Sequence, residues 1–99
     1  MTQIERITEM ERSLDEANTA IAKLHIALRE YLDVQEKIAG LMAYYSGGDW
    51  MKDYEDDAAG LLPQGLKRGV LSEDSVFDLI SDNRAMAQML EESVNKLSL

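Results

Sequence analysis

The sequence predicts an all-α protein in which a long N-terminal helix and a shorter C-terminal helix form an antiparallel, coiled-coil-like hairpin. A glycine-rich connector with a short helix joins them. Apolar residues recur at alternating steps of three and four in both end segments, without the period-two alternation of strands. Five of the six glycines and the only proline lie between residues 47 and 72. At 99 residues, the chain is expected to form one helical domain, residues 1–99.

The first helix is predicted over about residues 3–46. Two seven-residue series, one from Ile7 and one from Met10, hold twelve positions, of which only Gln35 is polar. Thr2 is the predicted N-cap, with Glu5 three residues later. Ser46-Gly47-Gly48 is expected to end the helix, because glycine readily adopts a left-handed conformation.

Such a helix would be about 65 Å long. A compact 99-residue chain has a radius of gyration of about 13 Å. We therefore expect a bend or break near Asn18-Thr19 or near Asp33, or one end that protrudes and needs a partner.

The connector is predicted over about residues 47–72, with a short helix over about residues 50–58. Asp49 is its expected cap and Gly60 its expected stop. The final helix is predicted over about residues 73–97. Ser72 is its expected N-cap, and Glu73 and Asp74 place favourable negative charge in its first turn.

The final helix, about 38 Å long, is too short to cover the whole apolar face of the first. The uncovered residues are expected to bind a partner protein or a second copy of the chain, since large apolar stripes in water mark interaction sites. The alternative is that the first helix folds back or that its N-terminal turns fray. The candidate partner-binding residues here are Ile4, Ile7, Met10 and Leu14.

Four aromatic residues, Tyr44, Tyr45, Trp50 and Tyr54, lie within eleven positions beside the densest acidic run. Trp and Tyr are favoured at binding hot spots and are equally suited to filling a small core. We favour core packing for most of them and keep Trp50 and Tyr54 as candidate partner contacts.

Nineteen Asp and Glu oppose ten Lys and Arg, which gives a net charge of −9. This balance argues against direct nucleic-acid binding, which needs a basic surface. Solubility is the ordinary explanation of the charge. The alternative function is an acidic nucleic-acid mimic, such as a phage or mobile-element anti-defence protein, that blocks the basic groove of a nucleic-acid-handling protein. Its candidate acidic surface comprises Asp53, Glu55, Asp56, Asp57, Glu73, Asp74, Asp78 and Asp82.

No catalytic residue, cofactor, metal site or small-molecule substrate is inferred, and the protein is not expected to be an enzyme. The chain has no Cys and one His, which excludes thiolate chemistry and a multi-histidine site. A calcium loop starting at Asp53 would place Ala58 where Gly is needed and Gln64 where Glu is needed, so only loose cation attraction is left open. His25, without a fixed catalytic neighbour, is interpreted as a boundary residue.

The first residues carry charges throughout and lack the apolar stretch of a signal peptide. The longest apolar run, residues 38–45, is too short to span a bilayer. An acidic surface would also be repelled by anionic lipids. We therefore expect a cytoplasmic protein that does not bind membranes.

The connector carries a set of residues that resembles the signature of a family of small bacterial proteins, a domain of unknown function. The resemblance implies an intracellular bacterial protein and assigns no activity, substrate, cofactor or functional residue. The residues that carry it are Tyr44-Tyr45, Trp50, Asp53-Tyr54-Glu55, Gly60, Leu62-Pro63, Leu66 and Lys67-Arg68-Gly69-Val70-Leu71-Ser72-Glu73-Asp74.

Overall fold

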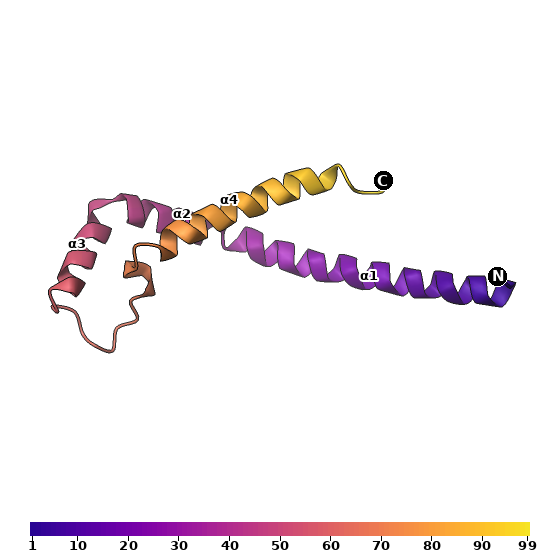
Figure 1. The fold of residues 1–99 in the computed structure, drawn as a ribbon, viewed down its shortest axis with the longest axis horizontal. Helices are drawn as coiled ribbons and strands as arrows, with labels where there is room; N and C mark the ends of the chain where they lie inside the picture. Colours follow the sequence, from indigo (N-terminus) through magenta and orange to yellow (C-terminus); the bar gives the residue numbers. More distant parts are fainter. The chain divides into compact units, whose positions relative to one another are not determined.

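The computed structural model describes all 99 residues, and every regular element in it is helical (Figure 1). The predicted all-α class is therefore confirmed. The chain divides into two compact units, Met1–Glu36 and Lys37–Leu99. None of the helices combines the length and the apolar character that crossing a membrane requires. The elements are α1 (Gln3–Asp33), α2 (Gln35–Ser46), α3 (Gly48–Ala58), the 3₁₀ turn η1 (Gly69–Leu71) and α4 (Ser75–Val94).

The first unit consists of α1, and its start is the predicted one. The backbone amide of Glu5 donates to Thr2 Oγ1 over 3.1 Å, so Thr2 satisfies one of the free donors of the first turn. The helix runs without interruption through residues 18 and 19, so the break suggested there is wrong. None of the residues of α1 is buried.

The break predicted near Asp33 is confirmed, because α1 ends at that residue and α2 starts at Gln35. The side chain of Gln35 donates from Nε2 to the carbonyl oxygen of Tyr31 over 3.1 Å. This carbonyl is the one that a continuous helix would offer to the backbone amide of Gln35. A side chain that enters the backbone ladder in this way is a known cause of helix interruption.

The second unit begins within α2, at Lys37, and this helix ends at Ser46 as predicted. Gly47 is extended (φ −92°, ψ 173°) rather than left-handed, and it is the N-cap of α3. The prediction that Asp49 caps this helix is wrong, because α3 begins at Gly48 and Asp49 lies in its first turn. A Cβ atom at Gly47 would lie 3.2 Å from the carbonyl oxygen of Ala43, so the tight α2–α3 junction favours glycine.

The stop of α3 at Gly60 is confirmed. Gly60 has φ +75°, the left-handed conformation that glycine tolerates best. Its amide donates to the carbonyl of Asp57 over 3.0 Å, and the amide of Leu61 donates to the carbonyl of Asp56 over 3.0 Å. This pair of bonds is the Schellman arrangement, which satisfies carbonyls left free at a helix end.

The start of the last helix differs from the prediction. The N-cap of α4 is Asp74, whose side chain makes no capping hydrogen bond, so the prediction that Ser72 caps this helix is wrong. Ser72 instead follows η1, and its amide donates to the carbonyl of Gly69 over 3.2 Å. The hydroxyl of Ser75 donates to the same carbonyl over 2.6 Å. The serine hydroxyl at the start of α4 therefore stabilises the preceding turn.

The core of the second unit takes one side chain from each of its elements. Ile38 of α2, Trp50 of α3, Leu71 of η1 and Val76 of α4 are buried. The hydroxyl of Tyr45, in the last turns of α2, donates to the carbonyl of Glu73 over 3.3 Å. The end of α2 therefore lies beside the start of α4, as in an antiparallel hairpin. The pairing predicted for the rest of the first helix stays a prediction.

Candidate functional site

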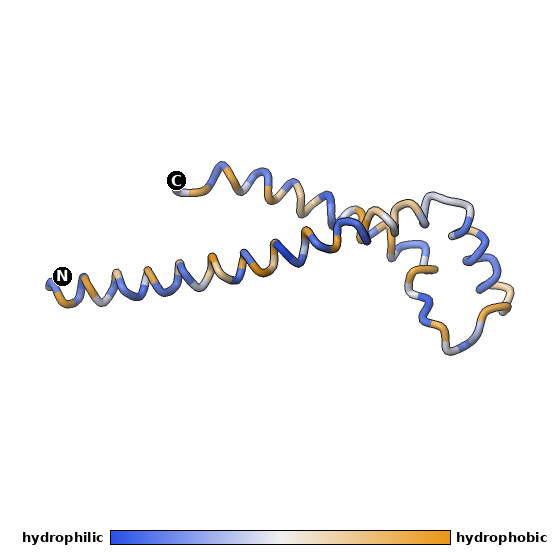
Figure 2. The backbone as a smooth tube through the Cα atoms, turned by 180° about the vertical axis from the view of Figure 1, so that it is seen from behind, coloured by the Kyte–Doolittle hydropathy of each residue, from blue (hydrophilic) through white to orange (hydrophobic).

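The predicted apolar seam lies open along α1. Ile4, Ile7, Met10 and Leu14, the four candidate partner-binding residues, are 53–77% exposed. Figure 2 shows hydrophobic positions recurring turn by turn along this helix. We call the following six residues of the two heptad series the α1 seam: Ile7, Met10, Leu14, Ala17, Ile21 and Leu24. All six belong to one unbroken helix and are exposed, so they form a continuous apolar line available to another surface.

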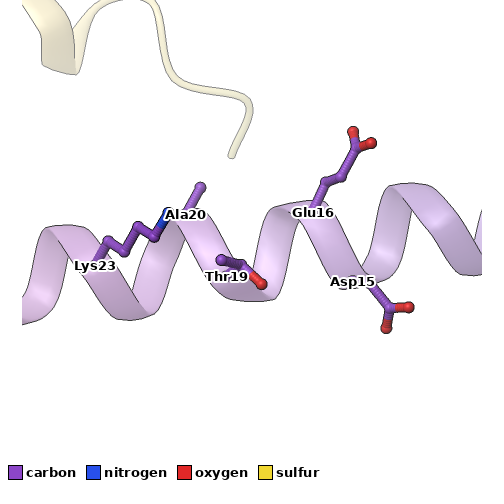
Figure 3. Close-up of a pocket in the computed structure, with 5 residues that line it drawn as sticks. All are labelled: Asp15, Glu16, Thr19, Ala20 and Lys23. Carbon is purple, nitrogen blue, oxygen red and sulfur yellow. The ribbon is translucent and has the colours of Figure 1, made fainter.

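A hollow elsewhere on α1 lacks the converging polar side chains of a ligand-binding site. Its lining side chains come from successive turns of this one helix and are all exposed. Figure 3 shows Asp15 and Glu16 pointing to opposite sides of the helix, so their carboxylates do not converge on a common point. The lining residues are Asp15, Glu16, Thr19, Ala20 and Lys23.

In the second unit, Trp50 is the centre of an aromatic cluster. Its ring lies 5.0 Å from that of Tyr45, edge to face, and 5.2 Å from that of Tyr54, stacked. The indole Nε1 donates to the carbonyl of Val70 over 2.9 Å. Trp50 is only 7% exposed, so it packs in the core and offers little surface to a partner. Tyr54 is half-buried against it.

Glu73, predicted as part of an acidic surface, accepts hydrogen bonds from this cluster. The hydroxyl of Tyr54 donates to Glu73 Oε1 over 3.0 Å. This hydrogen bond and the negative charge of the carboxylate raise the pKa of Tyr54. The hydroxyl of Tyr45 donates to the backbone carbonyl of Glu73. Together the two tyrosines attach the segment before α4 to α2 and α3, a role that the sequence analysis missed.

Asp53 is also occupied within the unit. The hydroxyl of Tyr44 donates to Asp53 Oδ2 over 2.6 Å. This hydrogen bond is the main cause that raises the pKa of Tyr44 to about 12, and burial and the charges of Asp53 and Asp49 act in the same direction. A raised pKa disfavours ionisation of the phenol, so this environment does not activate Tyr44 as a nucleophile.

Arg68 organises the chain between α3 and η1. Its Nε donates to Asp57 Oδ1 over 2.8 Å, and its two terminal nitrogens donate to the carbonyls of Pro63 and Gln64 over 2.7 and 3.2 Å. A guanidinium supplies several donors in a fixed plane, which suits it to binding a carboxylate and two carbonyls at once. In the sequence, Arg68 stood out only as part of the connector signature, and no local pattern pointed to this role.

The remaining predicted acidic residues fall into two groups. Asp56 forms an ion pair with Lys52 across one turn of α3, with 3.1 Å between Nζ and Oδ2. Nowhere in the structure do three or more Asp, Glu or His side chains lie close enough together to bind a metal ion. Those with exposed side chains and no hydrogen-bond partner are Glu55, Asp74, Asp78 and Asp82.

A hollow of about 310 Å³ lies beside the Tyr44–Asp53 pair. Its wall is mainly apolar, and its polar groups are this pair and one lysine ammonium. The hydrogen bond between the phenol and the carboxylate occupies the one proton that the phenol can donate. The lining residues are Tyr44, Asp53, Leu62, Leu66, Lys67, Val70 and Leu71.

Comparison with known proteins places almost the whole chain in one family. The family model described as a domain of unknown function, DUF4298, matches residues 7–92. Searches of curated proteins and of solved structures find no match. Neither the family nor the all-helical fold gives a sign of catalysis. The matched range includes all of the α1 seam and both of the tyrosine–carboxylate contacts, and the chain belongs to the DUF4298 family.

Proposed function

We propose that the chain is an acidic, non-catalytic, cytoplasmic interaction module that self-associates through the α1 seam. The observation that carries the proposal is that α1, although 31 residues long, contains no buried residue. Amphipathic helices in folded proteins bury their apolar stripe against another element. A seven-residue repeat is the pattern by which one helix packs along another, so the partner surface would be a helix.

The exposed area is sufficient for reversible association. The five large seam side chains, Ile7, Met10, Leu14, Ile21 and Leu24, are 53–68% exposed. Covering the exposed part of each contributes about 1 kcal/mol, or about 10 kcal/mol for two helices. Association costs roughly 4–15 kcal/mol in lost freedom of motion. These magnitudes are comparable, so the complex would form and dissociate with protein concentration.

The geometry of the second unit supports a structural rather than a catalytic role for its polar groups. Asp53, Asp57 and Glu73 each accept a hydrogen bond that holds two segments of the unit together. The hydroxyl of Tyr44 donates to Asp53, and this hydrogen bond raises the pKa of the phenol. This unit would therefore act as a folded body that carries the associating helix.

The test is the oligomeric state across a range of concentrations, measured by light scattering and sedimentation. The wild-type chain should dimerise as concentration rises. Ile7→Glu with Leu14→Glu should stay monomeric, while its second unit keeps the wild-type rate of amide hydrogen exchange in α3. The matched control adds the same two charges off the seam, with Thr8→Glu and Thr19→Glu, and should dimerise like the wild type. A wild-type monomer at every concentration would refute self-association.

The acidic mimic is the second candidate function. It is favoured by Asp74, Asp78 and Asp82, exposed carboxylates at steps of four, which therefore lie along one face of α4. The other five residues of the predicted acidic surface support it less, because four of their carboxylates already have partners inside the unit. Capture of a basic nucleic-acid-handling protein that is lost at high salt and lost in Asp78→Asn with Asp82→Asn would support it. Binding that is unchanged by salt would contradict it.

A further inference from the structure

We infer that the partner is a second copy of this chain whose α1 runs parallel and in register, with Arg6 of each copy paired to Glu11 of the other. The inference rests on the proposed function, because it specifies the direction and alignment of association through the same seam. It is carried by the charged residues that flank the seam.

Arg6 and Glu11 lie on opposite flanks of the α1 seam. Arg6 precedes the seam residue Ile7, and Glu11 follows the seam residue Met10. Both side chains are exposed, and neither makes a hydrogen bond or ion pair within the chain. In a parallel two-helix coiled coil, the residue just before a position of the first heptad series lies beside a residue of the partner helix. That partner residue is five places later in the sequence. Arg6 and Glu11 are five places apart, so in-register helices bring them together twice.

Antiparallel helices cannot pair Arg6 with Glu11. In that arrangement the flank that contains Arg6 lies beside the same flank of the partner helix, and the flank that contains Glu11 lies beside its own copy. The flank of Arg6 contains no acidic residue, so no antiparallel alignment gives Arg6 a carboxylate across the seam. A parallel alignment shifted by seven residues also fails, since it replaces Glu11 by Asn18 or Ile4. The other residues on the flank of Arg6 are Ser13, Ala20, Ala27 and Val34, and those on the flank of Glu11 are Ile4, Asn18, His25 and Leu32.

The seam residues agree with this arrangement. In the first of the two heptad series, two of the three seam residues are β-branched: Ile7, Leu14 and Ile21. The second series holds Met10, Ala17 and Leu24. β-Branched residues in the first series with leucine in the second favour parallel two-stranded coiled coils. Leucine in the first series with isoleucine in the second favours coiled coils of three or four helices. No isoleucine occupies the second series along the α1 seam. The expected complex is therefore a dimer.

Disulfide trapping shows whether the two helices are parallel or antiparallel. The chain has no cysteine of its own, so only introduced cysteines can form a disulfide. Ile7→Cys and Leu24→Cys are prepared as separate full-length variants and oxidised alone and mixed. In a parallel in-register dimer each residue faces its own copy at a distance that a disulfide can bridge. Each variant alone should therefore form a covalent dimer. Disulfides that form only in the mixture would show antiparallel helices and overturn the inference while leaving self-association intact.

Charge reversal tests the pairing itself. Arg6→Glu places like charges together at two sites and should weaken the dimer about tenfold. Adding Glu11→Arg to the same chain should restore the affinity, whereas Arg12→Glu, off both flanks, should change it less than twofold. Failure of the restoring substitution overturns the Arg6–Glu11 pairing. A wild-type chain that never dimerises refutes the proposed function as well, and association without either single-variant disulfide refutes this alignment alone.

Discussion

Replacing Trp50 by phenylalanine is the sharpest test of what holds the second unit together. The substitution removes the indole donor that binds the carbonyl of Val70 at 2.9 Å, and a hydrogen bond of this kind contributes about 1 kcal/mol. The smaller ring also leaves a gap where a 7%-exposed side chain packed, at a cost of about 1–2 kcal/mol. The expected loss is therefore about 2–3 kcal/mol.

This loss is large for the unit that bears it. Residues 37–99 should have a total stability of about 3–9 kcal/mol. Amide hydrogen exchange in α3 measures opening of this unit separately from α1, and exchange should accelerate by about 30- to 150-fold. Wild type and variant are compared at one protein concentration, because association shifts apparent stability.

The matched control is Phe77→Leu, which also removes an aromatic ring but from a 59%-exposed position next to the buried Val76. It should change stability by less than about 0.5 kcal/mol. The reasoning would be refuted if α3 exchanged at the wild-type rate in Trp50→Phe, or if Phe77→Leu accelerated its exchange equally.

Three further predictions concern the same unit. Tyr44 has its pKa raised from 10.0 to about 12 when folded, so its contribution to stability is complete below pH 10.0 and is lost as pH rises to about 12. Alkaline titration of unfolding should show this loss in the wild type and not in Tyr44→Phe. Gly60→Ala, at φ +75°, should lower the free energy of unfolding by about 1 kcal/mol, whereas Gly65→Ala should change it by less than about 0.5 kcal/mol in thermal melts. Arg68→Met should make residues 61–67 cleavable by protease several times faster, while Lys67→Met leaves the rate unchanged. Equal rates in both variants would contradict the proposed role of the Arg68 hydrogen bonds in holding this segment.

Helical periodicity and local signals account for the elements that sequence could predict. The Thr2 cap and the Gly60 stop each depend on residues within five positions, and both are present as predicted. The misplaced caps, Asp49 and Ser72, arose where several polar or small residues compete near one helix start. Gly47 and Asp74 occupy those positions instead, because caps by Gly and by Asp differ by only a few tenths of a kcal/mol.

The contacts that organise the second unit could not be predicted, because they join residues far apart in the chain. Tyr54 and Glu73 are 19 positions apart, and Arg68 is 11 positions from Asp57. No periodicity relates such pairs, and an acidic run of this composition is equally typical of a solvated helix face. The exposure of Ile4, Ile7, Met10 and Leu14, in contrast, was expected from helix length alone, whereas the exposure of Ile21 and Leu24 was not.

The absence of buried residues in α1 has a consequence for how the chain folds. A helix without tertiary packing depends on its own backbone bonds and its cap, and such helices are only marginally formed in water. Any partner that covers the α1 seam would supply the missing packing, so helix formation and assembly would be a single equilibrium. The helix content of the first third of the chain would then rise and fall with the amount of protein in the cell, and dilution would expose that segment to proteases before the second unit opens.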